Sequence, residues 1–294
     1  MLRIIIYFLF GTLFQNTAIS QNYIPYYNLR NEALYYYQQG DYKNADSLLT
    51  KAFSKADPFS KDLFLMALVK ANLYDSLATV NFIKRSFTGH RSSNTVSIVK
   101  REMEIFEKVI EPEELNSLLD SLDIVWKNYV YKFRHDIYID SLTKKVNALI
   151  KLDQKYRSEL KEKLPQYQLD SLRRYTDSIV QDRLIKLISE SGWPNIDERL
   201  NTILIHFDLD NFYKYKDIIL NEVKKGNLDP FWYAYMEERI MNIYFGKCVY
   251  KIWSIQCDDV DKVIEKRKNI GLSIYFTGPY RNHIRNKCNK NYMY

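Results

Sequence analysis

Residues that make tight turns are scarce in this chain, which has eight glycines and seven prolines among 294 residues. They make up about 5% of the sequence, where average usage would give about 12%. A β-sandwich or barrel depends on many such turns, so the composition disfavours both architectures. Hydrophobic residues make up 46% and aromatic residues 15% of the chain, which is far too apolar for a disordered protein. The sequence therefore predicts an all-α protein with an aromatic-rich core.

The first twenty residues have the three parts of a secretory signal peptide. Arg3 gives a positive start, a run of 11 largely apolar residues extends from Ile4 to Phe14, and Ala18 and Ser20 precede the expected cleavage site. We expect export to the periplasm or the medium, with a mature chain that begins at Gln21. The alternative, an uncleaved anchor, is disfavoured because so short a helix crosses only about half of a bilayer core. We expect no membrane span after cleavage.

Charged residues of both signs are interleaved along most of the chain, whose net charge is +7. This pattern is typical of solvated helix faces, and export makes nucleic acid an unexpected partner. The exception is the tail at 279–294, which has no acidic residue and carries Arg281, Arg285, Lys287 and Lys290. We interpret this basic tail as a frayed terminus, with a patch for acidic surfaces as the alternative.

The cysteines are three in number: Cys248, Cys257 and Cys288. Export permits a disulfide, and a bridge between the first two is one possibility, but the odd count leaves at least one thiol over. No paired Cys-x-x-Cys motif is present, and the four histidines are not spaced like a metal site. Phosphate-binding glycine loops are absent from the sequence as well. We expect neither a metal nor a cofactor.

Residues 24–56 carry a helix–turn–helix pattern, within a helical module that we place at 21–92. Small residues stand where two helices would approach closely, and Gly40-Asp41 marks the turn between them. The pattern resembles a tetratricopeptide repeat at Leu29, Ala33, Gly40, Tyr42, Ala45, Leu49 and Ala52. It recurs loosely at Ala67 and Ala78, which gives fewer units than a stable array needs. We therefore expect a short helical module docked on another part of the chain, and this module is a candidate surface for a protein partner.

A polar stretch at 88–94 reads as a loop, and hydrophobic periodicity predicts helices over most of the remaining sequence. The expected helices span about 95–109, 111–134, 137–163, 166–190, 197–207, 210–225, 230–245 and 258–270. Residues 249–255 alternate weakly, as in a strand. We divide the region into connecting helices at 93–145 and a helical domain at 146–278.

Short polar motifs occur at intervals through the second half of the chain. They are Asp153-Gln154-x-x-Arg157, Gly192-Trp193-Pro194, His206-Phe207-Asp208, Glu238-Arg239-Ile240, and Arg267 with Gly271-Leu272. Their order over about 146–276 resembles the bacterial domain family of unknown function 6624, which has no assigned activity. The chain departs from that family at Glu238, Cys248 and Lys251, where the family has Asp, Gln and Gly. Roles that need that Gln or that Gly are therefore not implied here.

His206 is the candidate general base among these residues. Asp208 or Glu238 is expected to orient it, and an anionic substrate is expected to bind Arg157, Arg239 or Arg267. The full candidate set is His206, Asp208, Asp153, Arg157 and Arg239. The alternative to a catalytic role is a structural one, in which these residues form ion pairs and caps that join helices and Trp193 is a packing anchor.

Arg239 lies between Met236 and Ile243 on one helix face, so we expect it in a buried ion pair with Asp153, Asp208 or, less favourably, Glu238. Two functional hypotheses follow. The favoured one is an exported, non-enzymatic helical protein that binds a partner. The alternative is a hydrolase-type enzyme that uses the region around His206, Asp208 and Arg239. Convergence of the polar side chains on an open site would favour the enzyme.

Overall fold

The computed structural model describes residues 22–88, 96–134, 137–194, 198–252 and 259–274. Within these ranges every regular element is a helix, which confirms the predicted all-α class. The expected signal peptide, the basic tail and most of the loop at 88–94 lie outside them. Among the described helices, none is both long and apolar enough to cross a bilayer.

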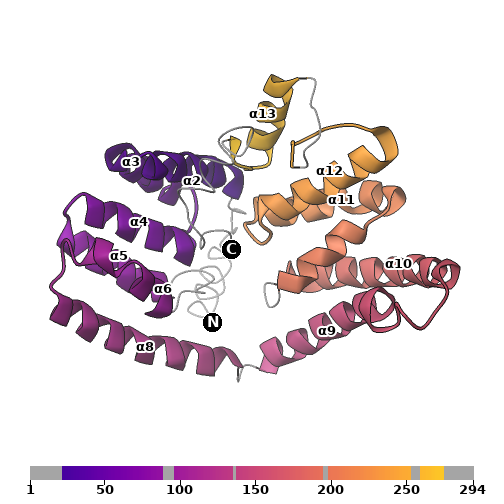
Figure 1. Ribbon diagram of the computed structural model, residues 1–294, viewed down its shortest axis with the longest axis horizontal. Coiled ribbons are helices and arrows are strands. Elements are labelled where there is room, and N and C mark those ends of the chain that lie inside the picture. Colours follow the sequence, from indigo (N-terminus) through magenta and orange to yellow (C-terminus); the bar gives the residue numbers. More distant parts are fainter. Residues whose placement is uncertain (1–21, 89–95, 135–136, 195–197, 253–258, 275–294) are drawn as a thin grey trace, which may run out of the picture.

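The first half of the chain consists of helices that pack in sequence order. They are α2 (Tyr23–Gln38), α3 (Tyr42–Phe53), α4 (Ser60–Asn72), α5 (Ser76–Thr88), α6 (Val96–Arg101), α7 (Met103–Phe106) and α8 (Pro112–Arg134). Helix α2 pairs with α3, and α4 pairs with α5, through short turns that make each pair antiparallel. Figure 1 shows the pairs stacked one on the other, with α8 below them.

The expected close approach of two helices is present between α2 and α3. Ala33 and Ala45 are fully buried in one apolar cluster with Leu49 and Met66. A larger side chain at either alanine would push the two helices apart, which explains the small residues there. Ala52 belongs instead to the larger core described below.

The second half begins with α9 (Ile137–Gln154), which continues as a π-helical turn, η1 (Lys155–Glu159). The remaining elements are α10 (Gln166–Ser191), the 3-10 helix η2 (Glu198–His206), α11 (Leu209–Lys224), α12 (Pro230–Phe245) and α13 (Val260–Asn269). Three expected helices therefore differ from the structure. The one at 95–109 is divided into α6 and α7, the one at 137–163 ends as an α-helix at Gln154, and the one at 197–207 is a 3-10 helix.

The strand suggested by the alternation at 249–255 is wrong for the part that the structure describes. The backbone N–H groups of Val249 and Tyr250 donate to Oε2 of Glu238, at 2.8 and 2.6 Å, rather than to a neighbouring strand. A strand needs a partner to satisfy its backbone, and a buried carboxylate takes that role here. Residues 253–258 lie outside the described part of the chain.

The largest core joins the two ends of the sequence. Tyr23, Tyr26 and Tyr27 of α2 are buried in the same cluster as side chains of α9 to α12. Helix α2 contacts both α11 and α13, and Figure 1 shows α13 above the space between α2 and α12. The N-terminal module therefore docks on the C-terminal helices of its own chain.

Two polar contacts and two glycines fix how α2 docks. Asn28 Nδ2 donates to the carbonyl oxygen of Lys268 at 2.9 Å, and Asn31 Nδ2 donates to that of Gly271 at 3.0 Å. A Cβ atom at Gly271 would lie 2.8 Å from Cβ of Tyr27, and one at Gly226 would lie 2.7 Å from the ring of Tyr23. Both glycines also have positive φ, at 78° and 73°, so they serve the turn and the close approach together.

Candidate functional site

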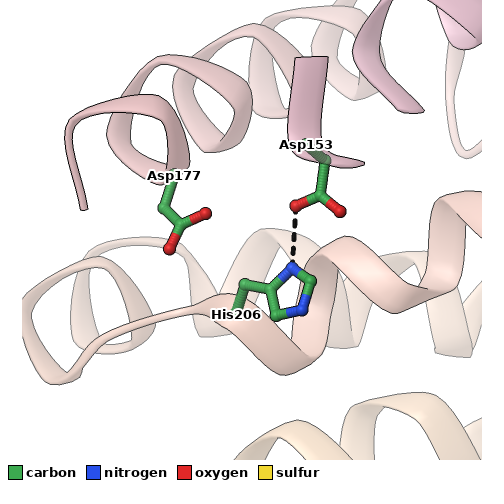
Figure 2. A group of neighbouring side chains, drawn as sticks. All are labelled: Asp153, Asp177 and His206. Carbon is green, nitrogen blue, oxygen red and sulfur yellow. Dashed lines mark hydrogen bonds and ion pairs between the residues drawn. The ribbon is translucent and has the colours of Figure 1, made fainter. Parts of the chain in front are cut away.

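Polar side chains from several helices converge where α9 ends. They are Asp153 and Gln154 from α9, Arg157 from η1, Asp177 and Gln181 from α10, His206 from η2 and Arg239 from α12. Figure 2 shows the two carboxylates and the imidazole of this cluster, with Asp153 and His206 joined by a hydrogen bond. We call these seven residues the polar cluster.

His206 and Asp153 form a hydrogen-bonded pair with the geometry of a base that is oriented by a carboxylate. Nδ1 of the imidazole lies 2.7 Å from Oδ1 of the carboxylate, whose side chain is 1% exposed. The other carboxylate oxygen accepts a hydrogen bond of 2.7 Å from Nε2 of Gln154. The imidazole itself is 17% exposed, and its Nε2 atom has no hydrogen-bond partner within the described residues.

The protonation of this pair follows from its surroundings. Burial by itself would raise the pKa of Asp153, but the hydrogen bond and charge of His206, the charge of Arg157 and the Gln154 bond together hold that pKa below its usual value. An ionised carboxylate only accepts hydrogen bonds, so Nδ1 of His206 carries the proton that they share. In the neutral ring the lone pair is then on Nε2, which faces away from Asp153 in Figure 2.

Arg157 links the two carboxylates of the polar cluster. Its Nη2 atom forms a close ion pair with Asp177 Oδ1, and its Nε atom lies 3.5 Å from Asp153 Oδ1. Burial raises the pKa of the Asp177 carboxyl, against the lowering influence of Arg157. The Arg157 and Asp177 side chains are 20% and 18% exposed, so this side of the polar cluster is reached by solvent.

Two unusual elements position these side chains. Arg157 lies on the π-helical turn η1, and His206 is the last residue of η2, a 3-10 helix of nine residues. Runs of 3-10 helix beyond three or four residues are uncommon, and π-helical turns are rare and are frequently found at functional sites. Gln181, which is fully buried, donates 3.0 Å to the carbonyl oxygen of His206 and holds the end of η2 against α10.

Asp153, Asp177 and His206 each offer one atom that could bind a metal ion, and these atoms lie within 4.8 Å of one another. The charges around them do not favour a cation. Arg157 pairs with both carboxylates, and Nδ1 of His206 is bound to Asp153. A metal ion would have to displace the guanidinium to reach either acid.

The acid that orients His206 is Asp153, and the expected roles of Asp208 and Glu238 are wrong. Asp208 is the exposed N-cap of α11, where its Oδ1 accepts from the backbone N–H of Asn211 at 2.8 Å. Glu238 is fully buried and binds the backbone at 249–250. Both acids are committed to local backbone groups, which leaves the imidazole to a carboxylate 53 residues away in the chain.

The expected buried ion pair of Arg239 is also wrong. Arg239 is partly buried, and its Nη1 atom donates 3.1 Å to the carbonyl oxygen of Phe207. It forms no ion pair with an acid in the described part of the chain. Burial lowers the pKa of its guanidinium, and neighbouring Arg157 adds to that effect, against the influence of Tyr244, Tyr235 and Asp177.

Two further motif residues lie outside the polar cluster. Arg267 is buried, and its guanidinium donates to the carbonyl oxygens of Ser273, at 2.6 Å, and Tyr250. Burial lowers the pKa of Arg267 to about 10. Trp193 is buried in the core, as a packing anchor requires, and its backbone N–H donates to Oε2 of Glu222 at 2.8 Å. These residues hold loops in place rather than contribute to a site at His206.

Sequence reasoning missed Asp177 and Gln181. They lie one helical turn apart on α10, on the side that buries Val180 and Leu184. Polar residues in a buried stripe are the signal that would have identified them, because a buried polar group needs a partner. Their partners, Arg157 and the His206 carbonyl, come from other elements.

No protein-family model, no curated protein sequence and no solved structure matches this chain. What the polar cluster does is therefore inferred from its own chemistry.

Proposed function

We propose that the protein is an exported, hydrolase-type enzyme in which His206 acts as a general base. The observation that carries the proposal is the 2.7 Å contact between Nδ1 of His206 and the buried carboxylate of Asp153. A base oriented in this way by a carboxylate is the arrangement that proton abstraction requires. In this proposal, Nε2 removes a proton from a water molecule as that water attacks the substrate, and Asp153 stabilises the imidazolium that forms.

The free ring nitrogen favours this role over a purely structural one. A fully buried histidine that only joins helices is expected to satisfy both of its ring nitrogens, because an unpaired buried polar atom is costly. Nε2 of His206 has no partner in the described ranges, and the ring is 17% exposed. The structure thus leaves one nitrogen for an external molecule while the other is held by Asp153.

The motif residues that resemble the family of unknown function 6624 support the same proposal. Asp153, Gln154, Arg157, His206 and Arg239 come from three motifs that are far apart in sequence, and all five lie in the polar cluster. Helix packing alone does not require short polar motifs to meet at one place. A functional site requires it, because the residues that act together must lie close together.

Export is supported by the disulfide bond of Cys248. Its possible partners, Cys257 and Cys288, lie outside the described residues. Disulfides persist in oxidising compartments, which agrees with the signal-peptide pattern at 1–20. Binding of a protein partner by the N-terminal module has less support, because Tyr23, Tyr26 and Tyr27 are already buried against the C-terminal helices.

The proposal is tested with p-nitrophenyl acetate and p-nitrophenyl phosphate as probes for ester and phosphoester hydrolysis. We expect His206→Gln to lower kcat/KM for the probe that is hydrolysed by about 10²–10⁴-fold, the usual contribution of a general base. Asp153→Asn should give a loss of similar order, since an amide can impose the wrong tautomer on the ring. Asp208→Asn is the matched control, because asparagine caps a helix as well as aspartate does and activity should be unchanged.

A second measurement keeps the test decisive if neither probe is hydrolysed. Diethyl pyrocarbonate acylates accessible, unprotonated imidazole nitrogens, and peptide mass mapping locates the product. We expect rapid modification of His206 in the folded wild-type protein and slower modification in Asp153→Asn. An unmodified His206 in the folded protein would contradict the proposal, because its Nε2 atom would then be unavailable to a substrate.

A further inference from the structure

Arg239 has more hydrogen-bond donors than the structure uses. A guanidinium has five N–H groups, and Arg239 engages one of them, with the carbonyl oxygen of Phe207. Phe207 directly follows His206 in the chain, so the contact holds the guanidinium at the end of η2, the helix that carries the proposed base. Throughout the described ranges, the other donors of Arg239 have no protein acceptor.

The acids of the polar cluster are already engaged by other residues. Asp153 binds His206 and Gln154, and Asp177 is paired with Arg157. Arg239 is therefore a partly buried positive charge without an ion-paired carboxylate, and the charge of Arg157 acts on it unfavourably. A cation that is partly removed from water is stabilised by an anion that lies against it.

Arg157 also has one N–H group that makes no hydrogen bond within the described residues. Its Nε atom is buried and makes no hydrogen bond in the described part of the chain, although Asp153 Oδ1 lies 3.5 Å away. Arg157 is held by Asp177, so its position is fixed before any ligand arrives. Arg239 comes from α12 and Arg157 from η1, so two separate elements place the two guanidiniums.

We propose that Arg239, with Arg157 beside it, binds the oxyanion group of the substrate on which His206 acts. This inference rests on the proposed function, and it specifies the substrate class as a molecule with a phosphoryl or carboxylate group. Both groups present two oxygens to the fork of a guanidinium, which is the geometry that arginine recognises best. The bound oxyanion supplies the anionic partner that Arg239 lacks and brings the substrate to the free Nε2 of His206.

The test is a titration of the full-length protein with inorganic phosphate and, separately, with acetate. Isothermal titration calorimetry measures Kd, and the His206 ring resonance in NMR reports binding at the polar cluster. We expect saturable binding of at least one probe. The tighter of the two identifies the anionic group as phosphoryl or carboxylate.

Variants assign the binding to Arg239. Arg239→Gln should raise Kd by about 10–100-fold, the loss expected for one charge-assisted hydrogen bond. Arg239→Lys keeps the positive charge but loses the forked guanidinium. Its Kd should therefore lie between those of the wild type and Arg239→Gln. Arg183→Gln is the matched control, because Arg183 is an exposed arginine on α10 and its loss should leave Kd unchanged. A melting curve confirms that each variant is folded.

The outcomes separate this inference from the proposed function. Suppose that the wild type hydrolyses neither probe and resists acylation while His206→Gln binds the anion with unchanged Kd. That result would contradict the role of His206 as a base and would support the anion site. If the base is confirmed but neither probe shows saturable binding, the anion site is overturned. Equal Kd values for the wild type and Arg239→Gln would also overturn it, since the binding would then lie elsewhere.

Discussion

Asp153 and Asp177 are neighbouring carboxylates whose environments act in opposite directions. The pKa of Asp153 is lowered, because hydrogen bonds and nearby positive charge outweigh its burial. The pKa of Asp177 is raised, because burial outweighs its pairing with Arg157. The ionised form of Asp153 therefore stabilises the fold, whereas the ionised form of Asp177 costs stability. The hydrogen bond and charge of His206 are the largest lowering influences on Asp153, so this difference follows from which acid holds the imidazole.

A pH-dependent test follows for these two residues. A folded-state pKa below the unfolded value of about 3.9 gives Asp153 a stabilising contribution that is complete above that value and is lost as pH falls through the folded pKa. Asp153→Asn should therefore lower the free energy of unfolding by about 1.5–3 kcal/mol near neutral pH, with a smaller difference near pH 3. Urea denaturation at both pH values measures the difference.

Asp177→Asn is the counterpart on the other carboxylate. Its raised pKa means that the ionised form costs stability once pH exceeds the folded pKa, so a neutral amide should be tolerated or slightly stabilising near neutral pH. Equal losses in the two variants at neutral pH would show that the two acids are not differentiated as described.

At the scale of the element, most helix ends follow from residues a turn or less away. Asp229 caps α12 by accepting from the backbone N–H of Phe231 at 2.9 Å, and Pro230 takes the first helical position. Gly192 ends α10 with φ of 73°. These local signals explain why the expected bounds of α10, α11 and α12 agree with the structure to within a residue or two. No such local signal accounts for the helix types of η1 and η2, which pack against α9 and α10.

The docking of α2 is tested by two glycines with the same φ. Gly40 and Gly271 both have φ of 78°, but a Cβ at Gly40 meets nothing within 4 Å, whereas one at Gly271 lies 2.8 Å from Cβ of Tyr27. We expect Gly40→Ala to cost about 1–2 kcal/mol of unfolding free energy from backbone strain alone. Gly271→Ala should cost about 1–3 kcal/mol more, because α2 must move to admit the methyl group. Chemical denaturation of both variants measures the difference, and equal losses would argue against a tight α2–α13 approach.

At the scale of the whole molecule, α2 completes a core that is mostly built from the second half of the chain. Side chains of α2 and of residues 52–59 pack with those of α9 to α12, and Tyr26 OH donates 2.7 Å to Asp62 Oδ2 within the first half. The first and second halves therefore depend on each other for burial of apolar surface. The connecting helices at 93–145 therefore lie between two parts of the sequence that contribute side chains to the same core.

This dependence predicts the behaviour of a fragment that spans 137–274. Without Tyr23, Tyr26, Tyr27 and Phe59, the fragment exposes a large part of its core, so we expect no cooperative thermal transition and strong binding of a hydrophobic dye. Co-expression with a fragment that spans 22–134 should restore a cooperative melt. A fragment 137–274 that melts cooperatively within a few degrees of the full chain would show that the second half folds on its own.

The sequence by itself determined the all-α class, most helix bounds and the residue types of the site. Those features depend on periodicity, caps and composition, which act over a few neighbouring residues. Only the tertiary structure decided which groups meet. The acid for His206 comes from 53 positions away, and Asn31 of α2 bonds to a carbonyl 240 positions away. Sequence reasoning chose nearer acids for His206, and Asp208 and Glu238 were already bound to backbone N–H groups beside them. Pairings at such separations depend on how whole helices pack, and no local pattern in the chain encodes that.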